Sequence, residues 1–214
     1  MPIQRTTDAQ MSESSSAREK VTVRLKSAYG FGSVAFGVVD NGFSYFLLLF
    51  YSQVIGLDAR LVGIAITTAL VFDALSDPVV GYWSDNLRSR WGRRHPFMYV
   101  SAVPVALSYF LLWTPPSDLS DTSMFWYLLV LAVFIRTFIT LYETPSTALA
   151  PELTADYHDR SSLLSFRYFF GWTSGIAMSV MMFMVIFPSQ ATEANPDGRF
   201  NPGSYEIFGI VASV

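Results

Sequence analysis

The sequence contains no cysteine, only two histidines and few charged residues. Of its 214 residues, 14% are charged and 51% are hydrophobic, whereas a soluble domain has about 25% charged residues. The absence of cysteine excludes disulfides, thiolate metal sites and cysteine catalysis, and His95 and His158 are too few for a histidine-rich metal site. A net charge of −3 and a pI near 5.3 argue against nucleic-acid binding. The composition leaves either a membrane protein or an unusually apolar globular protein.

The distribution of apolar residues favours a membrane protein. Five apolar segments are each long enough to cross about 30 Å of hydrocarbon as a helix; they span residues of about 28–51, 61–83, 96–113, 124–148 and 163–187. A sixth apolar segment, 204–214, reaches the end of the sequence, and we expect it to be an incomplete sixth helix. Short alternating segments typical of barrel strands are not seen. The predicted fold is therefore an all-α transmembrane bundle, preceded by a polar cytoplasmic tail at 1–27.

Lysine and arginine are unevenly divided between the two sides of this predicted bundle. Two lie in segments expected outside, Arg60 and Arg199. Ten lie in segments expected on the side of the tail: Arg5, Arg18, Lys20, Arg24, Lys26, Arg88, Arg90, Arg93, Arg94 and Arg160. Cytoplasmic loops carry the excess of basic residues. We therefore predict an integral protein of the plasma (inner) membrane with a cytoplasmic N-terminus.

Ionisable residues inside the apolar segments are the candidate functional residues. Each costs about 2.5–3.5 kcal/mol at a helix centre, so such residues face a bundle interior or a water-filled pathway. There are six: Asp40, Asp73, Asp77, Arg136, Glu143 and Arg167. The set favours a polar transport pathway, and the alternative is a group of salt bridges that only hold the helices together.

Spacing groups these residues further. Asp73 and Asp77 are one helical turn apart with Ser76 beside them, and their oxygens suit Na⁺ or a carboxyl-bound proton. A second group follows spacings of four, three and four along one helix: Arg136, Thr140, Glu143 and Thr147. This polar stripe predicts a lined cavity, or alternatively a buried ladder of hydrogen bonds.

The fifth segment offers an arginine, a tryptophan and two glycines. Arg167 could bind substrate hydroxyls or neutralise a carboxylate. Trp172 could stack on a sugar ring, although packing or lipid contact is the more common role of a tryptophan in a membrane helix. Gly171 and Gly175 form a Gly-x-x-x-Gly pattern, which permits close helix packing.

One stretch of sequence resembles a known transporter family. Residues 72–85 read FDALSDPVVGYWSD and residues 89–97 read SRWGRRHPF. They resemble the second helix and following cytoplasmic loop of the glycoside–pentoside–hexuronide:cation symporters, in the major facilitator superfamily. The run from Tyr29 to Gly32 and the Glu143-Thr144-Pro145 motif support the same resemblance, which extends over residues 28–190.

The resemblance implies a twelve-helix transporter of two six-helix halves, of which this chain is the N-terminal one. Such a protein carries a sugar with Na⁺ or H⁺ by alternating access and needs no cofactor. The implied cation-binding residues are Asp73, Ser76, Asp77, Thr140 and Glu143. Candidate substrate-binding residues are Asp40, Arg136, Thr147, Arg167 and Trp172, and the candidate cytoplasmic gate is Asp85, Arg90, Arg93 and Arg94.

The expected partners are a sugar or glycoside, the coupling cation, the lipid bilayer and the C-terminal half, with no nucleic acid. Two alternatives share the fold. Residues 93–97 also resemble the proton-coupled sucrose transporters, and a non-transporting membrane receptor would use the same architecture. An enzyme is disfavoured, because the sequence shows no Ser/His/Asp arrangement, metal cluster or glycine-rich phosphate loop.

Overall fold

The computed structural model describes residues 21–193 and 195–213, and this part of the chain is almost entirely helical. Five helical spans are long and apolar enough to cross a membrane: Val23–Val54, Ala59–Asn86, His95–Trp113, Asp121–Leu153 and Tyr157–Ser189. A shorter helix, α11 (Pro202–Ser213), follows them. These helices confirm the predicted all-α transmembrane fold. Of the polar tail predicted at 1–27, residues 1–20 lie outside the described residues, and residues 23–27 belong to the first helix instead.

The first span is not one regular helix. It consists of α2 (Val23–Phe31), α3 (Val34–Asn41), the π-helical turn η1 (Gly42–Phe46), α4 (Leu47–Leu49) and a second π-helical turn, η2 (Phe50–Val54). The Thr22 hydroxyl caps α2 by accepting from the Leu25 amide, so the helix begins five residues before the predicted span. Lys26 lies in this added turn, where its Nζ is 2.8 Å from Asp159 Oδ1.

The remaining spans all begin before their predicted first residues. They are α5 (Ala59–Asn86), α6 (His95–Trp113), α7 (Asp121–Thr147), the short α8 (Ala150–Leu153) and α9 (Tyr157–Met181), which continues through η3 (Met182–Ile186) and α10 (Phe187–Ser189). Asp58, Ser120 and Asp156 cap the first turns of α5, α7 and α9. These caps satisfy amide groups that have no partner inside the helix, which stabilises polar turns outside the apolar segments.

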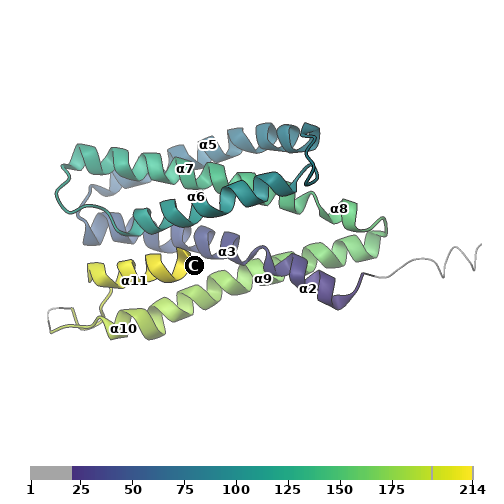
Figure 1. The fold of residues 1–214 in the computed structure, drawn as a ribbon. Coiled ribbons are helices and arrows are strands. Elements are labelled where there is room, and N and C mark those ends of the chain that lie inside the picture. Colours follow the sequence, from purple (N-terminus) through teal and green to yellow (C-terminus); the bar gives the residue numbers. More distant parts are fainter. Residues whose placement is uncertain (1–20, 194, 214) are drawn as a thin grey trace, which may run out of the picture.

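The helices form two groups (Figure 1). In the first, α7 packs against both α5 and α6. In the second, α9 packs along α2 and α3. Helix α11 lies against α6 and joins the two groups. At this junction the Trp113 and Tyr205 rings stack with centroids 5.9 Å apart, and both side chains are fully buried.

Glycines bring α3 and α9 into direct backbone contact. A Cβ atom on Gly37 would overlap the carbonyl oxygen of Gly171, and one on Gly175 would lie 2.9 Å from the carbonyl oxygen of Gly37. Both glycines of the Gly-x-x-x-Gly pattern therefore face the first span, and the close helix packing predicted from their spacing is present. This close contact sets the distance between the two helices that line the cavity described below.

Candidate functional site

A buried arginine from the fourth span joins carboxylates from the first and second spans. Arg136 Nη1 is 3.3 Å from Asp40 Oδ1 on α3 and 3.6 Å from Asp73 Oδ2 on α5. The Arg136 side chain is only 9% exposed, and its guanidinium carbon lies 4.8 Å from the centre of the Phe43 ring. One guanidinium nitrogen thus contacts two carboxylates on different helices.

Asp73 uses its other oxygen for a second contact with α7. The Thr140 hydroxyl donates to Asp73 Oδ1 at 2.5 Å, while the Ser76 hydroxyl donates to the backbone carbonyl of Asp73. The Asp77 side chain is exposed. Asp73 and Thr140 therefore offer a carboxylate and a hydroxyl between α5 and α7, and Ser76 and Asp77 lie within one turn of Asp73 on α5.

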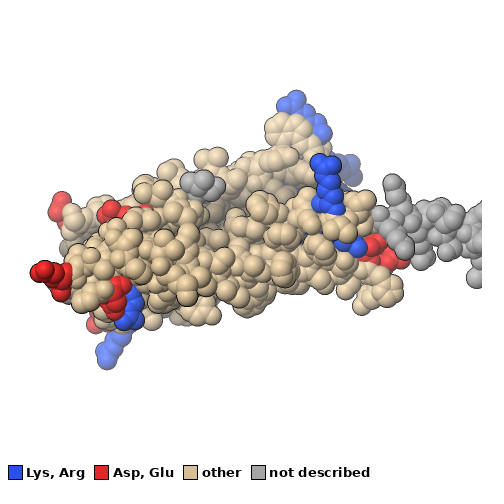
Figure 2. Space-filling model, turned by 90° about the horizontal axis from the view of Figure 1, so that it is seen from below, with Lys and Arg blue, Asp and Glu red and all other residues tan. Residues whose placement is uncertain are grey.

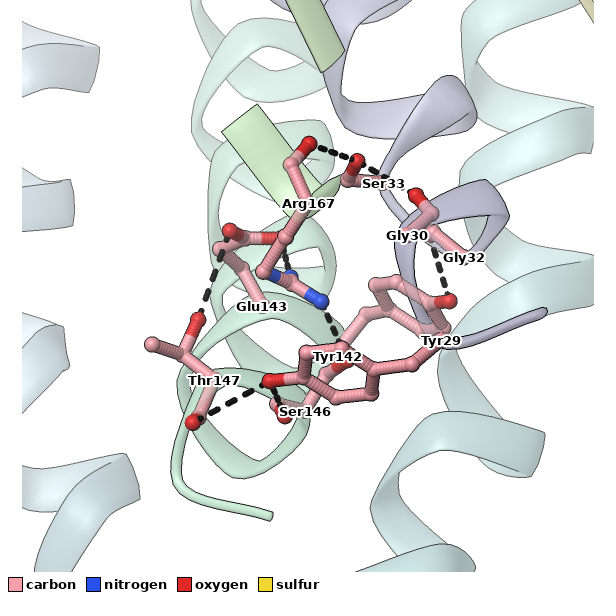
Figure 3. Close-up of polar contacts among 9 residues, drawn as sticks. All are labelled: Tyr29, Gly30, Gly32, Ser33, Tyr142, Glu143, Ser146, Thr147 and Arg167. Atoms are coloured by element: carbon pink, nitrogen blue, oxygen red, sulfur yellow. Dashed lines mark hydrogen bonds and ion pairs between the residues drawn. The ribbon is translucent and has the colours of Figure 1, made fainter. Parts of the chain in front are cut away.

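A second ionic cluster connects α7 with α9 (Figure 3). Arg167 Nη2 is 2.5 Å from Glu143 Oε2, and Arg167 Nη1 donates to the Ser146 hydroxyl at 2.8 Å. The guanidinium also lies over the ring of Tyr29, 5.5 Å from its centre. The Thr147 hydroxyl donates to Glu143 Oε1 at 3.5 Å. Arg167 is therefore buried with its charge compensated.

The first span is tied to the same cluster by hydrogen bonds to backbone carbonyls (Figure 3). The Ser33 hydroxyl donates to the carbonyl of Arg167 at 2.6 Å, and the Tyr142 hydroxyl donates to the carbonyl of Gly32 at 2.6 Å. The Tyr29 hydroxyl donates to the carbonyl of Ser146 at 2.9 Å. These contacts hold the interrupted part of the first span, between α2 and α3, against α7 and α9.

A cavity of about 520 Å³ lies between the first span and α9. Its polar lining includes Asp40, Glu143 and Arg167, so it is in contact with both ionic clusters. Aromatic side chains complete the wall, and of these Trp172 is 72% exposed. A volume of this size is typical of a small-molecule site, and the mixture of charged and aromatic groups suits a molecule with many hydroxyls and an apolar face.

The structure groups the predicted site residues differently from the sequence. Glu143, which the sequence placed with the cation ligands, pairs with Arg167. Arg136, which the sequence placed with the substrate ligands, pairs with Asp73 as well as with Asp40. Trp172 lines the cavity as its predicted role requires, whereas Thr147 contacts Glu143. Within residues 21–193 and 195–213, no group of three acidic or histidine side chains is placed to hold a metal ion.

Sequence reasoning missed Tyr29, Tyr142 and Ser146 as members of the second cluster. Ser146 had a detectable signal, because it follows Glu143 by three residues and continues the polar stripe of the fourth span. Tyr29 precedes Gly30 in the Tyr-Gly-x-Gly run that supported the family resemblance. Tyr142 carried no such signal, since its role depends on a carbonyl group that the break between α2 and α3 presents.

The candidate gate lies at the end of the bundle where α5 ends and α6 and α9 begin. Arg94 Nη2 is 2.9 Å from Asp85 Oδ1, and Arg94 Nε is 3.4 Å from Glu152 Oε1. Arg93 also reaches Glu152, at 3.3 Å, while the Arg90 guanidinium lies over the ring of Trp91. Figure 2 shows basic side chains gathered at this end, next to a long belt of the surface with few charges.

Comparison with known proteins identifies the family. The family model described as MFS/sugar transport protein matches residues 28–212. An uncharacterized symporter of Synechocystis sp. is 37% identical over 181 residues, which cover 82% of this chain and 33% of the relative. The putative glycoside/cation symporter YagG of Escherichia coli is 31% identical over 160 residues, covering 75% of this chain and 35% of the relative.

A vertebrate relative is also similar. The sodium-dependent lysophosphatidylcholine symporter 1 of Gallus gallus is 29% identical over 152 residues, covering 71% of this chain and 28% of the relative. The chain thus spans about a third of the length of the curated relatives it matches. The relatives are named as symporters rather than as enzymes. Because the family model covers nearly all of the described residues, the chain belongs to the MFS/sugar transport protein family and resembles its glycoside–pentoside–hexuronide:cation symporters.

Proposed function

We propose that the complete protein is a secondary active transporter that carries a sugar or glycoside together with Na⁺ or H⁺ by alternating access. One observation carries this proposal. The buried Arg136 contacts both Asp73, whose oxygens can receive a cation, and Asp40, which lines the cavity. Two binding sites that share one charged group are suited to bind their ligands in a coupled manner.

The proposed cation site lies between α5 and α7. Asp73 and Thr140 supply a carboxylate and a hydroxyl that are already in contact, and Ser76 and Asp77 supply further oxygens from the same helix. Such hard oxygen ligands suit Na⁺, and the carboxylates suit a proton. The name of the sodium-dependent relative supports Na⁺ as the coupling ion. Glu143 stays in this proposal as a neighbouring carboxylate, whose pairing with Arg167 would have to open before it could coordinate an ion.

The proposed substrate site is the cavity between the first span and α9. Asp40 accepts hydrogen bonds from substrate hydroxyls, Arg167 donates to them, and Trp172 provides a face for a sugar ring. Arg136 orients Asp40, and Thr147 orients Glu143. The relative named as a putative glycoside/cation symporter supports this substrate class.

We propose that the protein lies in the plasma (inner) membrane. In the proposed topology, the N-terminus and the basic end of the bundle face the cytoplasm. Asp85, Arg93 and Arg94, with Arg90 beside Trp91, then form a cytoplasmic gate. The ion pairs of Arg94 with Asp85 and of Arg93 with Glu152 would hold this end closed in the outward-open state. A C-terminal half completes the transporter and supplies the other wall of the cavity.

Uptake into vesicles by the complete transporter tests the proposal. We expect a labelled glycoside to accumulate under an inward Na⁺ gradient, and Asp73→Asn to abolish accumulation while the exposed control Asp118→Asn leaves it intact. Accumulation of sucrose under a proton gradient alone would favour the sucrose-type alternative, and saturable binding without flux would favour a receptor. Uptake of lysophosphatidylcholine in place of every sugar would contradict the proposed substrate.

A further inference from the structure

Arg136 presents an unusual arrangement, because one nitrogen serves two acceptors. Nη1 is the atom closest to both carboxylates, at 3.3 Å from Asp40 and 3.6 Å from Asp73. Both distances are longer than the 2.7–2.9 Å of a strong charged hydrogen bond. The nitrogen therefore lies between its two partners and is not fully engaged by either of them.

The surroundings of Arg136 restrict where its charge can go. The side chain is 9% exposed, the Phe43 ring covers the guanidinium, and Nε has no hydrogen-bond partner among the described residues. An uncompensated charge inside a membrane protein is costly. A guanidinium that leaves one carboxylate is therefore stabilised mainly by moving closer to the other.

We propose that Arg136 is a tethered cation that competes with Na⁺ for Asp73 and transmits the occupancy of Asp73 to the substrate cavity through Asp40. When Na⁺ binds to Asp73, repulsion between the two cations displaces Arg136 Nη1 toward Asp40. When Na⁺ leaves, the arginine moves back and compensates Asp73. Arg136 is thus a positioning residue and not a direct substrate ligand.

The position of Asp40 makes this movement relevant to the substrate. The Asp40 side chain is 46% exposed and lines the cavity. The Asp73 side chain is 21% exposed and is not part of the cavity wall. An arginine drawn fully onto Asp40 fixes the direction of the carboxylate and leaves its second oxygen to accept a substrate hydroxyl. The inference rests on the proposed function in taking Na⁺ as the ion that binds at Asp73 and the cavity as the substrate site.

A double-mutant cycle on Na⁺ binding tests the proposal without any sugar. Equilibrium binding of radioactive sodium is measured on the purified complete transporter and on Arg136→Gln, Asp40→Asn and the double variant. Arg136→Gln removes the competitor and should raise Na⁺ affinity by about 5-fold or more. Asp40→Asn leaves Arg136 with Asp73 alone and should lower Na⁺ affinity by a similar factor, although Asp40 is not itself an ion ligand.

The cycle distinguishes competition from a structural role. In the Arg136→Gln background, Asp40→Asn should have no effect on Na⁺ affinity, and Arg136→Lys should restore low affinity together with its dependence on Asp40. The matched control is Thr137→Val, because the Thr137 hydroxyl donates only to the carbonyl of Val133 in its own helix. This variant should bind Na⁺ like the unchanged protein.

Three results would overturn the proposal. The first is an Na⁺ affinity of Arg136→Gln that is no higher than that of the unchanged protein. The second is an Na⁺ affinity of Asp40→Asn that equals or exceeds that of the unchanged protein. The third is that the effects of the two substitutions on Na⁺ affinity add in the double variant. If the unchanged protein binds no measurable Na⁺, binding must appear in Arg136→Gln. Sugar uptake is measured separately, so a transporter that fails to carry sugar but follows this cycle would refute the proposed substrate and leave the role of Arg136 standing.

Discussion

Replacing Glu143 by glutamine tests whether the second ionic cluster stabilises the fold through its charge. Glutamine keeps the length of the side chain and an oxygen that can accept from Arg167, but it removes the negative charge. Arg167, whose side chain is 3% exposed, would then have as partners the amide oxygen of the new side chain, the Ser146 hydroxyl and the Tyr29 ring. None of these carries a charge that compensates the guanidinium.

The expected loss follows from this burial. Removing one partner of a buried ion pair costs about 3–5 kcal/mol. Because the Glu143 side chain is 25% exposed, solvent compensates part of the charge, and we expect a value near the lower limit, about 3 kcal/mol. At about 2–4 °C per kcal/mol for a chain of 150–250 residues, this loss corresponds to a decrease of about 6–12 °C in Tm.

Thermal unfolding of the purified protein in detergent measures this decrease. The control Ser146→Ala removes a hydrogen bond to Arg167 while both charges remain, and it should cost only about 1.5–2 kcal/mol. The double variant Glu143→Gln/Arg167→Met removes both charges and should recover most of the lost stability. A Glu143→Gln variant with unchanged Tm, or a double variant less stable than either single one, would refute the reasoning.

Three further predictions concern packing and capping. Gly37→Val should prevent α3 from reaching α9 and lower the free energy of unfolding by more than about 3 kcal/mol, because the backbone must move. The control Gly63→Val should be tolerated, since a Cβ atom there would meet nothing within 4 Å. Size-exclusion chromatography should show folded protein for the control and not for Gly37→Val. Trp113→Ala should lower the free energy of unfolding by about 3–5 kcal/mol and expose α11 to proteolysis. Asp58→Ala should cost about 1 kcal/mol, measured as a small decrease in Tm, because the carboxylate accepts from the Arg60 amide at 2.7 Å; an unchanged Tm would contradict its capping role.

The sequence predicted the number and positions of the long spans because twenty-residue apolar segments have few other stable structures. It did not predict the break at Gly32 and Ser33, which contacts with α7 and α9 hold in place. Nor did it predict the π-helical turns of the first span, because apolar composition does not mark them. The predicted helix starts lay too far inward, for example at 61 and 163 in place of 59 and 157, although Asp58 and Asp156 were visible capping signals. Apolar composition alone does not reveal polar turns that continue a helix.

The candidate site residues were found for a simple physical reason. A charged side chain inside an apolar span is costly, so the sequence itself singles out residues such as Asp40, Asp73 and Arg136. Their pairing could not be predicted, because spacing along one helix says nothing about which side chain of another helix lies opposite. Arg136 illustrates this limit, since only the fold shows that it reaches carboxylates on both neighbouring spans.

Cation movement driven by a sugar gradient tests the central claim, coupled transport, most directly. Vesicles containing the complete transporter are given an inward gradient of a transported glycoside and no cation gradient, while internal radioactive sodium and internal pH are followed together. We predict that Na⁺ or H⁺ enters in fixed proportion to the sugar. Entry of the sugar while neither cation moves would contradict the account.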